Sequence, residues 1–592
     1  MPWLEKINLA VRSANRRRLE RRHAHKGLTY ADWVQLHDTL DADVLHSLHQ
    51  RMAQLATRPL ISVLMPVFNP SPDWLRQAIG SVEQQIYPDW ELCIADDRST
   101  DPAVRRVLED AAARDPRIRV CWRTENGHIS RASNSALEMA RGEFAALLDH
   151  DDKLPAHALL LNAEAISHHP RARLLYSDED VLRFDGQRQS PNFKPDWNPE
   201  LMRAQNLVCH LGVYATGLLR QIGGFRPGYE GAQDYDLALR CIEHLEDDQI
   251  IHIPHVLYHW RQHPGSSAAG DEVKPYITEA GRRALHEHLQ RSGLEADVTP
   301  CPGGGYRVVP ALPDPAPSVS IIIWGVGDAT RVQRSLERLL AGARLDTEVL
   351  SCTGVDLQVA RRARGEFLCL VAGDIEIDSA TCLTEMMALA TVPGTGAVGA
   401  KLLHPDGSLA HGGFILGTGQ GAARAHPRLG AGQHGYRSRA VLNQNLAAVR
   451  SACMVIRRSL FLAVDGFDTR FNSGLRDVDL CLRLRGLGLR TVWAAHALAT
   501  QPRSALAERW PDEELELLRE MWGTALDDDP AYNLNLDLDA ADFRLAPQPR
   551  VNLKQSWLVR HSPPIEPNST RTVVPPAPPA RPMAATATGP GS

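Results

Sequence analysis

The sequence predicts an α/β protein with two tandem blocks, each built on a largely parallel sheet. Within residues 59–152, three apolar runs indicate buried strands, and segments with helical spacing separate them. The runs are Leu60–Val67, Glu91–Ala95 and Phe144–Leu148. Strands that alternate with helices are typical of βαβ units. A second alternating block begins near residue 318, so we expect two domains of the same class.

Composition favours a packed globular protein. The 592 residues are 43% hydrophobic and 23% charged. The formal net charge of −6 argues against broad nucleic-acid binding, which needs a basic surface. The ten cysteines include no C-x-x-C pair, which indicates reduced thiols in a cytoplasmic protein. The sequence has no apolar run of about 18 residues and no signal-peptide core, so we expect no membrane span.

Residues 1–58 are expected to be a helical N-terminal segment. Apolar residues recur at helical spacing from Trp3 to Ala14, and arginines follow from Arg12 to Arg22. Because a basic amphipathic helix can lie on an anionic membrane, residues 1–22 are candidates for peripheral contact with the inner face of the cytoplasmic membrane. A solvated helix packed on the next domain is the alternative. The tail 563–592, rich in Pro, Ala and Thr, is expected to be disordered.

Repeated motifs indicate that one domain has been duplicated. We expect a first domain over 59–296, a Pro- and Gly-rich linker over 297–317, and a second domain over 318–530. The repeated motifs are Ala140–Phe144 with Ala363–Phe367, Gly223–Phe225 with Asp465–Phe467, and Asp234–Leu237 with Asp477–Leu480. The spacing between the copies is too long for a solenoid.

Acidic residues follow two strands of the first block. Asp96 and Asp97 end one strand, and Asp149 and Asp151 follow another. Ligands of open α/β sheets bind at the carboxyl ends of the strands, so we expect Asp96 or Asp97 to contact a ligand, although both could cap the next helix. Asp149 and Asp151 are spaced to point the same way in an extended segment. They are candidate ligands of Mg²⁺ or Mn²⁺, which would also hold substrate phosphates.

Asp234 is the candidate catalytic base. It lies at an apparent helix start, where the helix dipole favours an ionised carboxylate. Such a group can take a proton from an attacking hydroxyl. The alternative is that Asp234 only caps the helix. Asp236 could also serve as the base, and it is a candidate residue on the acceptor side.

Tyr258-His259-Trp260-Arg261 contains three further candidates. His259 is expected to complete the metal shell, and Arg261 to bind phosphate. Trp260 and Trp197 are candidates for stacking on a sugar face of the acceptor, although either could be core.

Taken together, these motifs resemble glycosyltransferase family 2, the inverting enzymes with the A-type nucleotide-sugar-binding fold. The resemblance covers about 59–290 strongly and 318–500 weakly. It rests on Ile61–Asn69, Ala95–Asp101, Asn134–Phe144, Leu148–Asp152, Tyr176–Asp180, Phe193–Trp197 and Tyr258–Arg261. The last three of these segments resemble those of a bacterial subgroup that builds surface polysaccharides such as O-antigen. The fold implied is two tandem A-type domains.

The resemblance implies a role for each candidate residue. Pro66 and Asn69 lie in the donor-binding opening, and Asp96 and Asp97 would hold the nucleoside. Asp149 and Asp151 would hold the metal and the diphosphate, and Asp234 would be the base. The family usually has Glu before that Asp, whereas this chain has Gln233, which puts the supporting interaction in doubt. The partners implied are a nucleotide-sugar donor and a glycan or lipid-linked acceptor.

The second block departs from the family pattern. Pro66 maps to Trp324, and Asp149-His150-Asp151 maps to Ala372-Gly373-Asp374, while Asp477 survives. We therefore expect a degenerate module that supports the first domain or grips the glycan, because a site without metal ligands has little to stabilise a leaving diphosphate. A two-headed polymerase and a non-catalytic glycan-binding scaffold remain alternatives.

Overall fold

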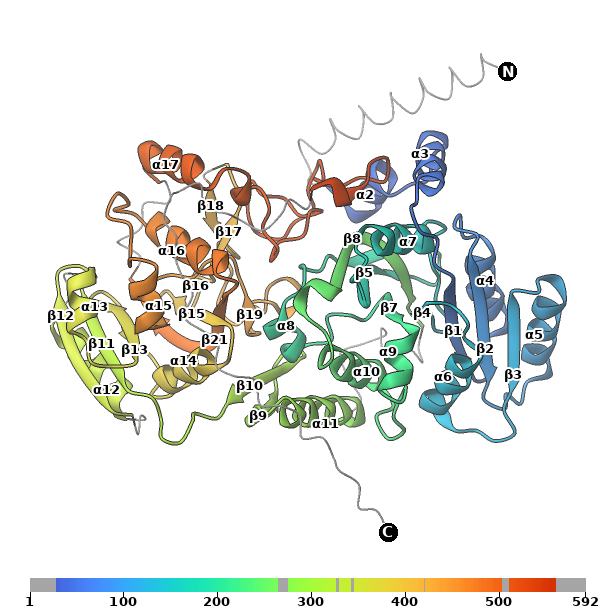
Figure 1. Cartoon of the computed structure of the whole chain (residues 1–592), viewed down its shortest axis with the longest axis horizontal. Coiled ribbons are helices and arrows are strands. Elements are labelled where there is room, and N and C mark those ends of the chain that lie inside the picture. Colours follow the sequence, from blue (N-terminus) through green and yellow to red (C-terminus); the bar gives the residue numbers. More distant parts are fainter. Residues whose placement is uncertain are drawn as a thin grey trace, which may run out of the picture.

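The computed structural model describes residues 28–263, 275–325, 329–341, 345–419, 421–502 and 510–560. Two sheets, each covered by helices, lie side by side and are joined by a β-hairpin (Figure 1). The predicted basic helix over 1–22 and the predicted disordered tail over 563–592 lie outside these residues. Within the described part, none of the helices has the length and apolar character needed to cross a bilayer.

The first module is built on a mixed eight-stranded sheet in the order β3-β2-β1-β4-β7-β5-β6, with β8 beside β5. Its strands are β1 (Ile61–Val67), β2 (Trp90–Asp96), β3 (Ile118–Trp122), β4 (Phe144–Leu147), β5 (Leu174–Leu182), β6 (Arg188–Asn192), β7 (Gly212–Ala215) and β8 (Ile250–Arg261). Every residue of β1 and β2 is buried, as expected of parallel strands covered on both faces. Because β1, β2 and β4 are parallel, their carboxyl ends share one edge of the sheet.

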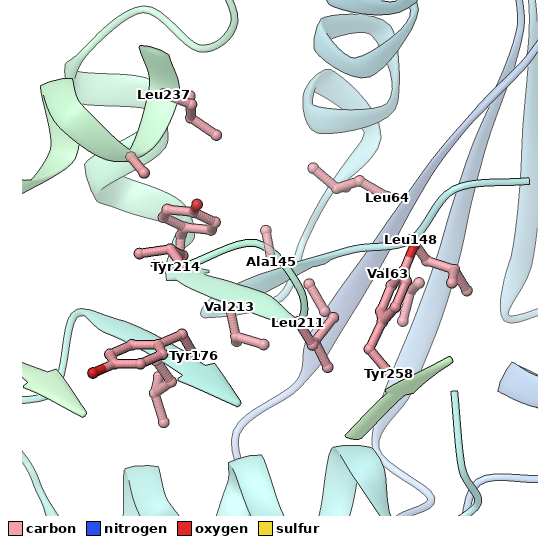
Figure 2. Packing of buried hydrophobic residues seen from close by; sticks show 14 of the residues in the cluster. Val63, Leu64, Ala145, Leu148, Tyr176, Leu211, Val213, Tyr214, Leu237 and Tyr258 are labelled. Carbon is pink, nitrogen blue, oxygen red and sulfur yellow. The ribbon is translucent and has the colours of Figure 1, made fainter. Parts of the chain in front are cut away.

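Helices cover both faces of this sheet (Figure 1). The helices of the first module are α4 (Pro72–Glu83), α5 (Pro102–Arg114), α6 (His128–Met139), α7 (Ala158–His168), α8 (Pro199–Ala204), α9 (Thr216–Gln221), α10 (Gln233–Ile242) and α11 (Pro275–Arg291), with a 3-10 turn η1 (Asp247–Gln249). Local sequence sets where α5 begins, because the Asp101 side chain accepts the N–H of Ala103 and Pro102 occupies the first turn. Buried side chains of β1, β4, β7 and β8 pack together behind the acidic edge (Figure 2).

The second module repeats the strand pairing of the first. Its strands are β11 (Val319–Trp324), β12 (Thr347–Cys352), β13 (Phe367–Ala372), β14 (Glu376–Ile377), β15 (Thr395–Leu403), β16 (Leu409–His411), β17 (Phe414–Leu416), β18 (Ala422–Arg424), β19 (Gln444–Asn445), β20 (Cys453–Arg457) and β21 (Arg490–Thr500). In the second module, β11 lies parallel between β12 and β13, as β1 lies between β2 and β4 in the first. Strand β20 pairs antiparallel with both β13 and β15. In the same way, β7 of the first module pairs antiparallel with both β4 and β5. The parallel pair β15·β21 matches β5·β8. The predicted tandem α/β fold is therefore confirmed.

The helices of this module are shorter on average. They are α12 (Ala329–Ala341), α13 (Leu357–Arg362), α14 (Cys382–Thr391), α15 (Arg458–Ala463), α16 (Leu475–Gly486) and α17 (Asp512–Trp522), with 3-10 turns η3 (Tyr436–Ser438), η5 (Gly523–Leu526) and η6 (Trp557–Arg560).

The repeated Ala-Arg-Gly-Glu-Phe motif has a structural role in both modules. The Ser62 hydroxyl donates to Glu91 at 2.6 Å and accepts the Gly142 N–H at 2.9 Å. In the second module, Ser320 donates to Glu348 at 2.5 Å and accepts the Gly365 N–H at 2.8 Å. A Cβ on Gly142 would lie 2.5 Å from the carbonyl oxygen of Leu60, so only glycine fits there. The duplicated motif locks strands together and is not part of a site.

Asp236 is also structural, which corrects its prediction as an acceptor-side residue. Its side chain is fully buried and pairs with Arg226 and with Arg240, whose Nε donates at 2.9 Å. The same pair recurs on α16, where the Nε of Arg483 donates to Asp479 at 3.0 Å. Side chains two residues apart on an α-helix point about 200° away from each other around its axis, so Asp234 and Asp236 face opposite directions.

Replacing Asp236 by Ala should destabilise the first module strongly, because it leaves the buried Arg240 guanidinium unpaired. Breaking such a pair costs about 3–5 kcal/mol. We expect a lower melting temperature by differential scanning calorimetry, and the same for Asp479→Ala. The control is Asp110→Ala, at an exposed position on α5. An unchanged melting temperature in Asp236→Ala would contradict the structural role.

The segment predicted as a linker is a packed hairpin instead. Strands β9 (Ala296–Pro300) and β10 (Tyr306–Pro310) pair antiparallel, and three glycines with positive φ make the turn between them. The Tyr306 hydroxyl donates to the carbonyl oxygen of Thr278 on α11 at 3.0 Å. The Pro- and Gly-rich composition reflects this turn and the extended residues after it, because glycine adopts positive φ without strain.

Both ends of the described chain pack on the first module. Helices α2 (Tyr30–His37) and α3 (Ala42–Ala53) lie within the segment predicted to be helical. After the second module, residues 531–558 return across the first: the Asn533 amide donates to the Asp178 carboxylate at 2.9 and 3.0 Å. Val551, Leu553 and Trp557 join the first module's core. The C-terminal segment therefore ties the two modules together.

Candidate active site

Two of the predicted carboxylates of the first module, Asp149 and Asp234, line one small pocket at the carboxyl edge of its sheet. This cavity of about 60 Å³ is called the acidic pocket here. Its walls include Pro66 from β1, Asp149 after β4, His210, Asp234 from α10 and Tyr258 from β8. Segments far apart in the sequence thus bring the candidate base and one candidate metal ligand to the same cavity.

Three carboxylates crowd the loop after β4. Burial and the neighbouring Asp151 raise the pKa of Asp149, and burial raises the pKa of Asp152 well above its usual value. The Tyr258 hydroxyl donates to Asp152 at 2.6 Å. Such a cluster is costly to ionise without a cation, so its hard oxygen atoms fit Mg²⁺ or Mn²⁺. Protons and a cation compete for Asp149, so cation binding should weaken as the pH falls.

Arg261 and His263 hold this loop in place. The Arg261 N–H donates to Asp152 at 2.7 Å, and its Nε donates to the carbonyl oxygen of Asp151 at 2.6 Å. The Nε2 of His263 lies 2.8 Å from the Asp151 carboxylate. The Nη2 of Arg261 also donates to the side-chain oxygen of Gln77 at 3.0 Å. Arg261 thus lies beside the acidic loop, and its binding of phosphate stays a prediction.

His259 points away from the acidic loop, so its prediction as a metal ligand is wrong. Its Nδ1 lies 2.6 Å from the buried Asp180 carboxylate, which also binds Arg188. Successive residues of a strand point to opposite faces, so Tyr258 faces the acidic loop and His259 faces away from it. His263, beyond the end of β8, is the histidine beside Asp151.

His210 is a site residue that the sequence analysis missed. It is stacked on Tyr258 with ring centroids 4.5 Å apart. Burial lowers the pKa of His210, but a hydrogen bond to Glu179 at 2.9 Å and the nearby carboxylates raise it to about 9. The ring is therefore cationic at neutral pH and partly offsets the negative charge of Asp149. A lone histidine between Cys209 and Leu211 carried no sequence signal for this role.

The two acids after β2 have different environments. Asp97 is buried and paired with Arg123 at 2.7 Å and with the Gly127 N–H at 2.9 Å. Asp96 accepts the Ser99 N–H at 3.1 Å through one oxygen, while its other oxygen is buried and has no partner in the described part of the chain. Asp96 is thus the better candidate for a ligand contact, and Asp97 shapes the loop.

Asn69 fixes the loop beside Asp96. Its side-chain oxygen accepts the Thr100 N–H at 2.8 Å, and its own N–H donates to the Ser99 hydroxyl at 3.0 Å. Asn69 therefore positions this loop.

Asp234 lies in the first turn of α10 and faces the acidic pocket. The Asn206 amide donates to its Oδ2 at 2.9 Å. Gln233, which stands where the family usually has Glu, accepts the Gly231 N–H at 2.7 Å and supports the loop before the helix.

The two candidate tryptophans lie in different places. Trp260 is half-buried, with its ring 5.7 Å from that of His210, near the acidic pocket. Trp197 instead lines a separate cavity of about 350 Å³ between the two modules, and its Nε1 donates to Asp247 at 2.8 Å. This larger cavity does not include the candidate base or the acidic loop.

The second module lacks an equivalent acidic cluster in its described residues. Asp477 is buried, accepts the Ser451 N–H at 3.1 Å and lies 3.4 Å from Arg450. The guanidinium of Arg476 covers the ring of Trp324 at 4.5 Å, where the first module has Pro66. The chain's own arginines thus neutralise the surviving carboxylate.

Comparison with known proteins relates the first module to a known family. Residues 62–221 match the family model described as glycosyl transferase family 2. This part of the first module is therefore similar to glycosyltransferase family 2. The match contains Asp96, Asp149 and Asp151, and Asp234 follows shortly after it.

Two relatives resemble both modules. The uncharacterized protein y4gI of Sinorhizobium fredii (strain NBRC 101917 / NGR234) is 41% identical over 548 residues, 84% of this chain and 60% of that protein. The O-antigen biosynthesis protein RfbC of Myxococcus xanthus is 35% identical over 541 residues, 84% of this chain and 42% of that protein. The chain therefore spans only about half the length of these relatives. The crystal structure of S. aureus TarS 1–349 with UDP-GlcNAc covers 40% of this chain and 68% of that chain at 22% identity, with a TM-score of 0.33.

Proposed function

We propose that the first module is a metal-dependent, inverting glycosyltransferase that moves a sugar from a nucleotide-sugar donor to an acceptor hydroxyl. The observation that carries this proposal is the convergence of Asp149 and Asp234 on one pocket. Asp149 belongs to the crowded acidic loop, which suits a cation. Asp234, the candidate base, lies on α10 and is bound by Asn206. The proposal thus gives the two acids different tasks.

Asp149 and Asp151 would hold the Mg²⁺ or Mn²⁺, and His263 lies beside Asp151. The bound cation would offset charge on the leaving nucleoside diphosphate. The free oxygen of Asp96 would accept a hydrogen bond from the nucleoside, because a buried carboxylate oxygen without a partner is costly.

Asp234 would take the proton of the acceptor hydroxyl as that oxygen attacks the anomeric carbon. The Asn206 amide donates to one carboxylate oxygen, and the Cys209 thiol also lies beside this carboxylate. A single displacement of this kind inverts the configuration of the anomeric carbon and needs no covalent sugar–enzyme intermediate.

We further propose that the acceptor is a lipid-linked or growing surface glycan at the cytoplasmic face of the membrane. The similarity to an O-antigen biosynthesis protein, which extends over both modules, supports this class of acceptor. A two-headed polymerase would need a donor site in residues 318–500, where Arg450 and Arg476 surround Asp477. A non-catalytic scaffold would not need the acidic cluster.

A thermal-shift panel tests this proposal on the full chain. We expect one of UDP, GDP, dTDP or CDP to raise the melting temperature in the presence of Mn²⁺ and to have little effect without it, because a ligand that binds only the folded state stabilises it. If none of the four nucleotides shifts the melting temperature with Mn²⁺, the donor-binding proposal fails and the scaffold alternative gains support.

A further inference from the structure

A second, polar pocket is linked to the candidate base through Asn206. This cavity of about 270 Å³ is called the basic pocket here, and Asn206 lines both it and the acidic pocket. The Asn206 amide contacts Asp234 at 2.9 Å. The other residues that line the basic pocket are Asn192, Phe193, Lys194, Pro195, Gln205, Leu207, Gly303, Arg437, Ser438 and Arg439. The Asn206 side chain therefore lies between a molecule in this pocket and Asp234, the proposed base.

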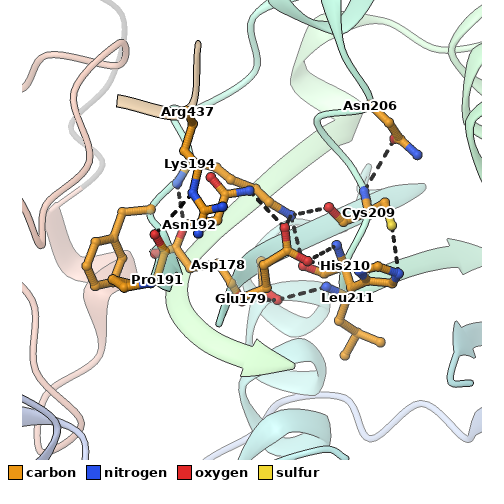
Figure 3. A network of polar contacts seen from close by, with 12 residues as sticks. Asp178, Glu179, Pro191, Asn192, Lys194, Asn206, Cys209, His210, Leu211 and Arg437 are labelled. Atoms are coloured by element: carbon orange, nitrogen blue, oxygen red, sulfur yellow. Dashed lines mark hydrogen bonds and ion pairs between the residues drawn. The ribbon is translucent and has the colours of Figure 1, made fainter. Parts of the chain in front are cut away.

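The second module supplies one wall of the basic pocket. Its turn η3 is anchored on the first module by Tyr436, whose hydroxyl donates to the carbonyl oxygen of Pro191 at 2.9 Å and accepts the Phe193 N–H at 2.8 Å. Ser438 donates to the carbonyl oxygen of Gly303 in the hairpin at 2.6 Å. Figure 3 shows Arg437 beside Pro191 and Lys194, and its Nε donates to the carbonyl oxygen of Pro191 at 3.3 Å. The wall is thus held in place by several bonds.

The lining of the basic pocket is cationic. It contains Lys194, Arg437 and Arg439 and no acidic side chain. Lys194 is offset by Glu179, 3.9 Å away, and donates to two main-chain oxygens. In the described part of the chain, neither arginine has a carboxylate within ion-pair distance. Arg437 is exposed and donates to the main-chain oxygens of Ser190 and Pro191, and the buried Arg439 leaves Nη1 without a partner in that part of the chain. The charge of the exposed Arg437 therefore remains for a ligand.

We propose that the basic pocket is the acceptor subsite and that it takes a saccharide carrying an anionic group, a carboxylate or a phosphate. This inference rests on the proposed function, because it places the acceptor next to Asp234. The anionic group pairs with Arg437, since a guanidinium matches the planar oxygens of both groups. A hydroxyl of the same saccharide extends past Asn206 to the base. The second module then selects the acceptor without binding a donor.

Saturation-transfer NMR on the full chain tests this subsite. The probes are methyl β-D-glucuronide and α-D-glucose 1-phosphate, and the neutral probe is methyl β-D-glucoside. We expect at least one anionic probe to bind about tenfold more tightly than the neutral one, as a charge-assisted pair allows. Arg437→Ala should remove that preference, and Arg437→Lys should restore part of it. Arg361→Ala, at an exposed arginine on α13, is the matched control and should bind as the wild type does.

Each outcome separates the subsite from the donor site. The Mn²⁺-dependent nucleotide shift should be unchanged in Arg437→Ala, because the acidic pocket lies on the other side of Asn206. Loss of probe binding with the nucleotide shift intact supports the subsite. Equal binding of neutral and anionic probes, no probe binding to the wild type, or wild-type binding in Arg437→Ala would overturn it. A missing nucleotide shift in the wild type would overturn the donor proposal instead.

Discussion

Asp151→Asn should abolish the Mn²⁺-dependent rise in melting temperature that a nucleoside diphosphate produces. The substitution removes a charged oxygen ligand and keeps the shape of the side chain. A ligand at about 100 times its Kd stabilises the folded state by about 2.7 kcal/mol, and we expect this stabilisation to disappear. Differential scanning fluorimetry with the nucleotide chosen from the panel measures it directly.

The matched control for this variant is Asp374→Asn, because Asp374 is the sequence counterpart of Asp151 in the second module. It should leave the nucleotide shift unchanged, since the described part of that module has no acidic cluster. Removing a carboxylate from the crowded loop also relieves repulsion with Asp149, whose pKa Asp151 raises. The apo variant should therefore fold at least as well as the wild type. A full nucleotide shift in Asp151→Asn would exclude this loop as the metal site.

Asp234→Asn should lower sugar transfer by roughly 10²–10⁴-fold while the nucleotide shift is retained. General-base catalysis contributes about this much, and an amide cannot take the acceptor proton. The amide retains the size of the side chain and can still bond Asn206. The measurement is the rate of nucleoside diphosphate release from the nucleotide sugar with a saturating acceptor, followed with a coupled assay.

Asp477→Asn in the second module is the control for the base. Asp477 is the repeat counterpart of Asp234, but Arg450 lies 3.4 Å from it and its carboxylate accepts a main-chain N–H. Transfer should stay within a few fold of wild type at a temperature where the variant is folded. Loss of transfer in Asp477→Asn with normal transfer in Asp234→Asn would mean that the second module is the catalytic one.

Local sequence signals were sufficient for the sheet and for the acids at its edge. The largely apolar β1 and the run before Asp149 were recognisable as buried strands because their burial follows from their own composition. Carboxylates directly after parallel strands then had to lie at one edge. The duplication was visible because both copies keep the residues that lock the strands, such as Gly142 and Gly365.

Side-chain direction and long-range contacts account for the failures. His259 and His263 are four residues apart, and only the path of β8 decides which one meets Asp151. Spacing predicts an acceptor-side role for Asp236 because it does not show that Arg226 and Arg240 surround the carboxylate. The predicted linker is a hairpin because its glycines form a turn that composition alone could not distinguish from a flexible connection.

The sequence by itself determined the fold class, the duplication and the position of the acids at the carboxyl edge of the first sheet, since these depend on residues close together along the chain. Only the tertiary structure decided that Asp149 and Asp234 share a pocket and that His210, bound to Glu179, lies beside them. It also placed Arg437 of the second module in a pocket that shares Asn206 with the acidic pocket. Residues more than 200 positions apart meet there through packing between modules, and no local pattern in a single sequence carries that information.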